Sequence, residues 1–168
     1  MKLSTKTRYA VRAVFDIAYH GLGRTTQARD IARRQEVPLR YLEQIFGELR
    51  RAKLIEGKRG PTGGYLLSRT PETITIGDII RATQGPIELL FDDSPAEPTV
   101  ATPADGKRSR RAAQRPSPNR QVAVTLWKEL AQKVGACFDD VTVRDLCHKG
   151  EALGLHRGDD QPRHMYFI

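Results

Sequence analysis

Apolar residues recur at spacings of three and four through the first half of the chain, which predicts a series of amphipathic helices. The first helix is expected over about 5–19. Thr25 and Thr26 are the expected cap of a second helix, and Val37 and Pro38 separate it from a third that runs to about residue 52. The predicted buried stripe of the third helix consists of Leu39, Leu42, Ile45, Phe46 and Leu49.

A small hairpin is predicted after the third helix. Residues 54–56 and 65–67 have the character of short strands, and a glycine-rich turn lies between them. The segment from the turn into the second strand has the sequence Arg59-Gly60-Pro61-Thr62-Gly63-Gly64-Tyr65. Its small residues allow a sharp turn and close approach of the backbone to another molecule. The predicted fold is therefore mainly α with a small β-hairpin: a winged helix-turn-helix domain followed by a long helix.

The second half of the chain changes character twice. Thr75 is the expected cap of a helix that ends before Gly85. Residues 92–120 then contain five prolines and no aromatic residue, and are acidic first and basic later, which predicts a disordered linker. This linker is either a solvated tether or a basic arm that adds non-specific affinity for DNA. A long helix is expected over about 119–137, and Thr142 caps a last one.

These elements divide the chain into four expected parts. They are a winged helix-turn-helix domain over 1–90, a linker over 91–120, a long helix with a short following helix over 121–150, and a tail over 151–168. The long helix carries an apolar stripe of Val122, Leu126, Trp127, Leu130 and Val134. The tail ends in four apolar residues, which are hypothesised to pack on a partner subunit or a second protein.

Charge is distributed very unevenly. The formal net charge is +8, and residues 1–69 hold 15 Lys and Arg against 6 Asp and Glu, whereas the remainder holds 13 against 14. A basic surplus confined to the helix pair and the hairpin favours a nucleic-acid partner over a merely soluble surface. The sequence has no run of eighteen apolar residues and no apolar signal segment at its start, so a cytoplasmic protein with no membrane partner is expected.

The third helix and the hairpin carry the candidate DNA contacts. Arg40 can reach guanine or phosphate, Gln44 can pair with adenine, and Glu43 can accept a hydrogen bond from cytosine. An ordinary solvated helix face is the alternative for these three residues, and the hairpin beside them favours DNA contact. The predicted DNA-binding residues are Thr26, Pro38, Arg40, Tyr41, Glu43, Gln44, Arg50, Lys58, Arg59, Gly60, Pro61 and Thr62.

Several motifs together resemble those of the IscR-type (Rrf2) winged helix-turn-helix regulators. They are Met1-Lys2-Leu3-Ser4, Arg8-Tyr9-Ala10, Tyr41-Leu42-Glu43-Gln44-Ile45-Phe46, Arg59-Gly60-Pro61-x-Gly63-Gly64-Tyr65 and Ile76-Gly77-Asp78-Ile79. The resemblance is dense over 1–90 and weaker over the two last predicted helices. It implies a homodimer held by the long helix through the stripe given above, bound to a two-fold symmetric operator, most often as a repressor. It also implies that the third helix reads the major groove, that Arg59 reaches the minor groove, and that Glu43 helps to select sites.

The chain departs from this family at the cluster site. Cluster-binding members hold a [2Fe–2S] centre with three cysteines in the loop before the dimer helix, but residues 92–120 contain neither Cys nor His. No cofactor is therefore expected, and sensing through a regulatory protein or a small metabolite is the first hypothesis. An atypical iron–sulfur cluster or metal site from Cys137, Cys147 and His148 is the second. Structural or surface cysteines are favoured over it, and Cys137 at the end of the long helix fits a core position.

A thiol enzyme and a DNA-binding accessory protein are the alternatives to a regulator. A thiol enzyme is not expected, because the adjacent Cys147 and His148 diverge on a helix and cannot pair well as nucleophile and base. A DNA-binding accessory protein without a regulatory role remains open.

Overall fold

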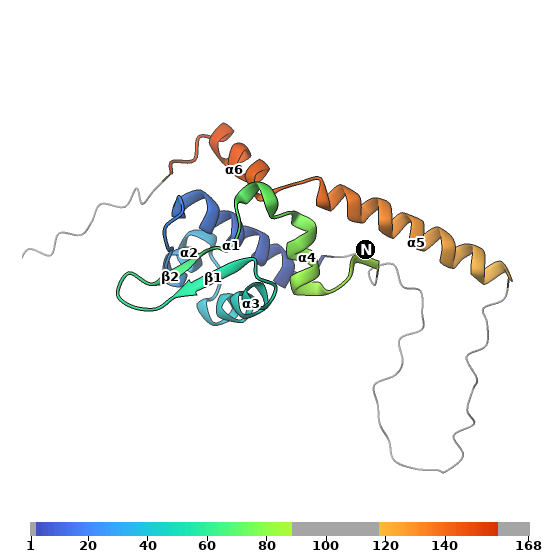
Figure 1. The fold of residues 1–168 in the computed structure, drawn as a ribbon, viewed down its shortest axis with the longest axis horizontal. Coiled ribbons are helices and arrows are strands. Elements are labelled where there is room, and N and C mark those ends of the chain that lie inside the picture. The colour runs from blue at the N-terminus through green and yellow to red at the C-terminus, as the bar shows by residue number, and fades with distance from the viewer. Residues whose placement is uncertain (1–2, 89–117, 158–168) are drawn as a thin grey trace, which may run out of the picture.

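The computed structural model describes residues 3–88 and 118–157, and its fold is mainly helical with one small hairpin (Figure 1). The elements are α1 (Thr5–Gly21), α2 (Ala28–Gln35), α3 (Leu39–Arg51), β1 (Ile55–Lys58), β2 (Gly64–Leu67), the 3-10 helix η1 (Pro71–Thr73), α4 (Ile76–Gln84), α5 (Pro118–Asp139) and α6 (Val143–Ala152). The predicted fold class is confirmed. Most of the expected linker and the apolar end of the tail lie outside the described residues.

Side-chain caps fix where two of the later helices begin. Thr75 accepts a hydrogen bond from the Asp78 backbone N–H, and Asp78 in turn accepts one from the Thr75 backbone N–H. Thr142 and Asp145 form the same reciprocal box at the start of α6. Each box pairs two backbone N–H groups that a helix start leaves without partners. Both threonine caps were predicted from the sequence.

The start of α2 differs from the prediction. Its N-cap is Gln27, which makes no side-chain cap, and Thr26 lies one residue earlier. The Thr26 backbone N–H donates to the Tyr65 carbonyl at 2.8 Å, and the Tyr65 N–H donates back to the Thr26 carbonyl at 2.8 Å. Thr26 is therefore a one-residue extension of the hairpin, because pairing with a distant strand replaced the local capping role.

α1 is the central element of the core. The other helices α2, α3, α4 and α6 and the strand β2 all pack against it. The core combines its apolar face with the buried stripe of α3 and residues from the hairpin and α4; fully buried members include Ala10, Ala13, Val14, Leu42, Ile45, Phe46, Leu49, Ile74 and Ile79. This packing leaves the opposite face of α3 in solvent.

A buried ion pair joins α2 to α1. Arg34 Nη2 lies 2.7 Å from Asp16 Oδ1, and Gln35 Nε2 donates to Asp16 Oδ2 at 2.9 Å. The Asp16 side chain is fully buried, whereas that of Arg34 keeps some exposure. A buried carboxylate is tolerated only with such partners, so this pair fixes how α2 sits on α1.

α5 projects away from the helical core, and α6 returns to it (Figure 1). The base of α5 is tied to α4 because Arg81 Nη2 lies 2.6 Å from Asp139 Oδ1. Thr75 and Thr142 then form an isolated antiparallel bridge, and α6 packs on α1 and η1. The sequence grouped α6 with α5 in a separate part over 121–150, but α6 contributes to the N-terminal core.

Candidate nucleic-acid interface

α3 presents a polar face to solvent because its apolar stripe is buried. Arg40, Glu43 and Gln44 are exposed along that face, and Pro38 stands exposed just before it as the N-cap. Tyr41 is half-buried, and its ring packs edge-on against Tyr9 with 5.9 Å between ring centroids. The predicted base-reading residues therefore share one accessible surface.

The hairpin, called the wing below, pairs β1 with β2 in an antiparallel register from Ile55↔Leu67 to Lys58↔Gly64. Its turn is closed by a hydrogen bond from the Gly63 N–H to the Gly60 carbonyl at 2.9 Å. A Cβ at Gly63 would lie 2.5 Å from the Lys58 carbonyl oxygen, so only glycine fits there. The five predicted wing contacts, Lys58, Arg59, Gly60, Pro61 and Thr62, are all exposed.

Two contacts fix the wing to the helix-turn-helix in addition to the Thr26 bridge. Thr25 Oγ1 donates to the Thr62 carbonyl at 2.7 Å near the wing tip. The Tyr65 ring packs on Phe46 of α3 with 4.2 Å between ring centroids. The wing is thereby held in register with both helices of the helix-turn-helix.

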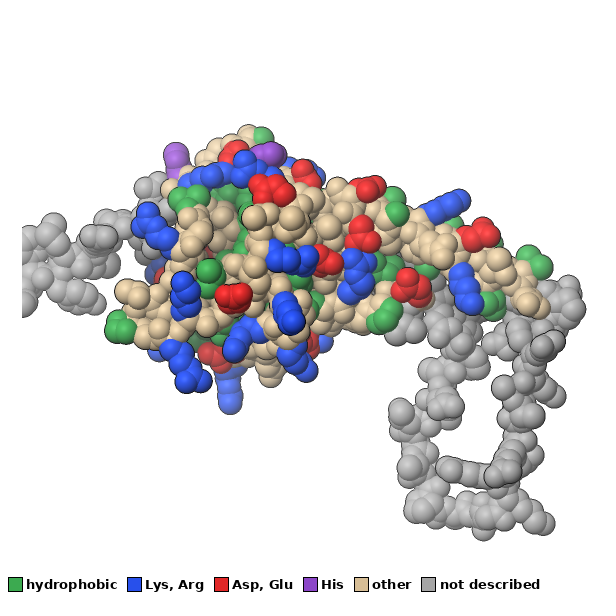
Figure 2. All heavy atoms as spheres, in the orientation of Figure 1, with side chains coloured by type: hydrophobic (Ala, Val, Ile, Leu, Met, Phe, Trp, Pro, Cys, Tyr) green, Lys and Arg blue, Asp and Glu red, His purple; other side chains and the backbone are tan. Residues whose placement is uncertain are grey.

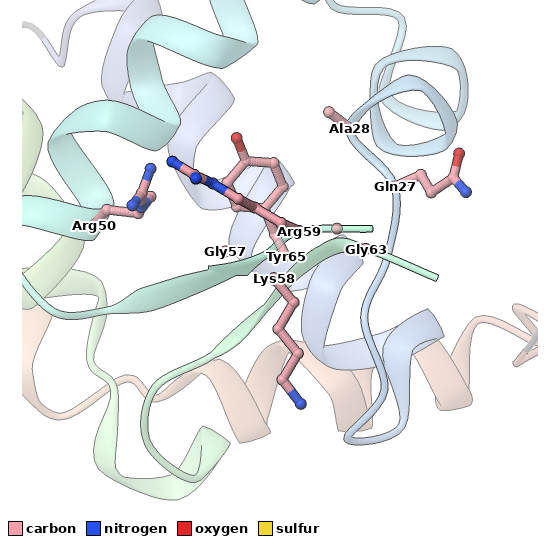
Figure 3. A pocket seen from close by; sticks show the side chains of 9 residues that line it. Gln27, Ala28, Arg50, Gly57, Lys58, Arg59, Gly63 and Tyr65 are labelled. Carbon is pink, nitrogen blue, oxygen red and sulfur yellow. The ribbon is translucent and has the colours of Figure 1, made fainter. Parts of the chain in front are cut away.

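A groove of about 340 Å³ lies where these three elements meet (Figure 3). Arg50 of α3 stands on one side and Gln27 and Ala28 at the start of α2 on the other, with Tyr65 and Arg59 between them. The Arg50 guanidinium lies close to the wing, since its Nε is 3.8 Å from the position of a Cβ at Gly57. Cations beside free helix N–H groups suit an anion such as phosphate.

Cations without an ion-pair partner occur in several places among the described residues, Arg24 and Arg29 among them, and four of them gather on this face. Ion pairs with carboxylates are formed elsewhere by Lys6, Arg33, Arg34, Arg69, Arg81, Arg144 and Arg157. Arg40, Arg50, Lys58 and Arg59 have no ion-pair partner among the described residues. Figure 2 shows Lys and Arg side chains along the lower edge of the core, the region of α3 and the wing, with few Asp and Glu between them. This face therefore carries uncompensated positive charge.

Six residues that line the groove are not among the predicted contacts: Gln27, Ala28, Gly57, Gly63, Gly64 and Tyr65. Gln27 and Ala28 lie at the start of α2, which the prediction placed at Thr26. Thr26 is only 8% exposed, and its backbone is bonded to Tyr65. Its predicted role as a helix cap is wrong, and its contact with DNA stays a prediction. The other predicted contacts lie on the α3 surface or on the wing.

A family comparison agrees with this architecture. The sequence profile of the Rrf2 family, described as iron-dependent transcriptional regulators, matches residues 3–149. The chain belongs to the Rrf2 family. The regulator IscR of Yersinia pseudotuberculosis is 32% identical over 153 residues, which cover 91% of this chain and 83% of the relative. IscR of Vibrio campbellii is 32% identical over 160 residues, covering 95% and 85%.

Solved structures give the same result. CymR, the global cysteine regulator of B. subtilis, superposes with a TM-score of 0.64 at 33% identity, covering 89% of this chain and 98% of CymR. T. potens IscR superposes with a TM-score of 0.63 at 28% identity, covering 99% and 97%. This Rrf2 protein is thus a DNA-binding transcriptional regulator, and its relatives are regulators rather than enzymes. None of its described helices is both long enough and apolar enough to span a bilayer.

The two cysteines of the Rrf2 protein have opposite environments. Cys137 on α5 is exposed in the single chain, which corrects the expectation of a core residue, and Cys147 on α6 is buried. Burial raises the pKa of the Cys147 thiol above its ordinary value. His148 Nε2 accepts a hydrogen bond from Arg144 Nε at 2.9 Å. Within residues 3–88 and 118–157, no three His, Cys, Asp or Glu side chains are grouped as a metal site would require.

Proposed function

We propose that the chain acts as a homodimeric repressor, with two copies of α3 in successive major grooves of a two-fold symmetric operator and two wings in the flanking minor grooves. The observation that carries the proposal is the uncompensated positive charge of Arg40, Arg50, Lys58 and Arg59 on one face. Backbone phosphates attract such a surface, and the released counterions make its affinity depend on salt.

Base recognition is assigned to the exposed face of α3. Arg40 lies in the first turn, the part of a recognition helix that usually approaches base edges, with Glu43 and Gln44 one turn further on. Arginine forms two hydrogen bonds to guanine, and glutamine does so to adenine. A glutamate accepts from cytosine and repels phosphate, so Glu43 would reject sites that offer it no donor.

Backbone contacts are assigned to the groove beside the wing. Arg50, Lys58 and the N–H groups at Gln27 and Ala28 suit phosphate oxygens, which position the protein without reading sequence. Arg59 stands at the wing tip beside small residues that leave room for a groove wall. A narrow minor groove has an enhanced negative potential, which favours an inserted arginine.

Dimerisation is assigned to α5. Val122, Leu126 and Trp127 are 72%, 52% and 40% exposed, which leaves a large apolar surface on a helix that projects from the core. Leu130 and Val134 continue this surface toward the half-buried base of the helix. A second copy of α5 would cover these side chains and bring two DNA-binding units together.

The dimer is tested with a matched pair of variants on α5. Leu126→Arg puts a charge into the proposed interface, whereas Gln132→Arg adds the same charge to an exposed position about 240° around the helix. Light scattering should give a monomer for the first variant and a dimer for the second. A dimeric Leu126→Arg protein would refute this interface.

The family description names iron dependence, but a [2Fe–2S] cluster does not fit the residues present. Such a centre needs four ligands that are ordinarily thiolates, and the chain contains two cysteines, of which Cys147 is buried with a raised pKa. We infer that the signal is a protein or a small metabolite. An absorbance spectrum and metal analysis of anaerobically purified protein test this inference, because a coloured protein with stoichiometric iron would overturn it.

The DNA-binding mode is tested at Arg59. A preferred duplex is first selected from a random pool, and failure to select one would favour a non-regulatory accessory protein. Arg59→Ala should then weaken binding by roughly 5- to 150-fold, the loss of one specific groove contact. Arg144→Ala removes an equal charge from α6, outside the proposed interface, and should bind like wild type. Equal affinities of both variants for the duplex would exclude the assigned role.

A further inference from the structure

A second cavity, of about 400 Å³, lies behind the wing. Its apolar walls are Ile17 and Ala18 from α1, Leu66 and Leu67 from β2, and Pro71 from η1. Successive side chains of a strand point to opposite faces, so Leu66 faces away from Tyr65, which lines the DNA groove. Leu66 therefore lines the cavity from the face of the hairpin opposite to Tyr65.

The rim of this cavity carries groups that suit an anion. Arg24 is exposed and has no ion-pair partner among the described residues. Ser68 lines the cavity, and its Oγ is buried without a hydrogen-bond partner in the part of the chain that the structure describes. A buried hydroxyl without a partner is costly. The Ser68 Oγ is shielded from solvent, so the side chain must rotate about χ1 to reach a ligand in the cavity, and a hydrogen bond to that ligand would then recover this free energy. Arg69 adds positive charge, although it is already paired with Asp78.

We propose that this cavity binds a small amphipathic carboxylate whose apolar part rests on Leu66 and Ile17 and whose carboxylate accepts hydrogen bonds from Ser68 Oγ and Arg24. A volume of about 400 Å³ is at the small end of the range for metabolite sites. The apolar walls exclude a highly charged ligand such as a nucleotide, and the cationic rim disfavours an amine. The proposal names the class of metabolite that the regulator would sense. The effect of that metabolite on transcription rests on the function proposed above.

Two segments that line the cavity, residues 23–24 and 66–67, lie next in the chain to the residues that hold the wing. Gly23 and Arg24 precede the residues that bond to the wing, where Thr25 Oγ1 donates to Thr62 and the Thr26 backbone pairs with Tyr65. Leu66 follows Tyr65 on β2. A ligand that moves either wall changes the angle of the wing against α2. By linkage, DNA binding must alter ligand affinity by the same factor.

The cavity is tested without DNA by titrating the isotope-labelled full chain with hexanoate and following backbone amide shifts. Saturable shifts at Ala18, Arg24 and 66–69 are expected, with a Kd on the order of 1 mM for a ligand of this size. Hexylamine, which has the same chain and the opposite charge, should bind at least about tenfold more weakly. No saturable hexanoate shifts, or equal binding of hexylamine, would overturn the proposal.

Two variants locate the carboxylate. Ser68→Ala should weaken hexanoate binding at least about tenfold, since a hydrogen bond to a charged group is lost, and it removes no hydrogen bond between described residues. Arg24→Met should weaken it about two- to fivefold, as expected for an exposed charge. Arg29→Met removes an exposed charge that does not line the cavity and is the matched control. Unchanged binding in Ser68→Ala would refute the assigned pose.

Coupling to DNA is measured separately on the selected duplex. Saturating hexanoate should change the DNA Kd at least about fivefold relative to equimolar acetate, which matches ionic strength without the apolar part. An unchanged Kd together with normal hexanoate shifts would overturn the regulatory coupling. If no preferred duplex can be selected, the proposed function fails, while the amide shifts still decide whether the cavity binds the carboxylate.

Discussion

Replacing Gly64 with alanine should detach the wing from the start of α2. Gly64 has a φ of 149°, and a Cβ there would lie 2.5 Å from the Thr26 carbonyl oxygen and 2.7 Å from its carbon. These are backbone atoms that cannot rotate away, so the two hydrogen bonds between Thr26 and Tyr65 must lengthen or break. Their loss at about 1 kcal/mol each, with about 1 kcal/mol of backbone strain, gives a destabilisation of roughly 2–4 kcal/mol.

Thermal unfolding followed by circular dichroism measures this effect. For a chain of this size, about 2–4 kcal/mol corresponds to a Tm lower by roughly 5–15 °C. Affinity for the selected duplex should fall as well, since the wing loses its fixed position. Gly57→Ala on the paired strand is the control for stability, because its Cβ would meet nothing closer than Tyr65 Cε1 at 3.6 Å. Equal Tm values for the two variants would refute this account of how the wing is held.

Three further predictions concern stability and thiol chemistry. Asp16→Ala should lower the free energy of unfolding by about 3–5 kcal/mol in a urea titration, because it leaves Arg34 without its buried partner. Cys137 should react with iodoacetamide at pH 8 much faster than Cys147, which is buried with a raised pKa; mass spectrometry of the modified peptides gives both rates. The hydrogen bond from Arg81 lowers the pKa of Asp139. The ionised Asp139 carboxylate therefore stabilises the fold at pH 7, and this stabilisation is lost as the pH falls below about 4. The difference in unfolding free energy between wild type and Asp139→Asn should therefore shrink from pH 7 to pH 3.5, and because the side chain is exposed it should stay below about 1 kcal/mol.

Local patterns in the sequence were sufficient for most of the architecture. The threonine caps of α4 and α6, four of the five residues of the α3 stripe and the glycine-rich turn were predicted because each depends on neighbours within four residues. Leu39, the fifth residue of that stripe, is only half-buried. The exposed face of α3 followed from the same periodicity. The candidate DNA contacts on that face and on the wing remain predictions.

Contacts between distant residues could not be read from those patterns. Thr26 has the composition of a helix cap, but it pairs with Tyr65, which is 39 positions away. Asp16 is an isolated acid on an amphipathic helix, and nothing near it indicates that Arg34 will reach it. The cavity behind the wing likewise needs α1 and β2 together.

The attachment of α5 at one end alone has a mechanical consequence. Arg81 and Asp139 fasten the base of the helix to α4, and Ala131 is still buried, so residues 118–130 extend about 20 Å beyond the packed part. A tilt of about 9° there would move the tip by about 3 Å, close to the rise of one base pair along DNA. In the proposed dimer, the angle at this fastening would set the distance between the two recognition helices. The angle at the base of α5 would then decide which spacing of operator half-sites the dimer accepts. A small change near Asp139 could alter the preferred spacing without altering any residue that contacts DNA.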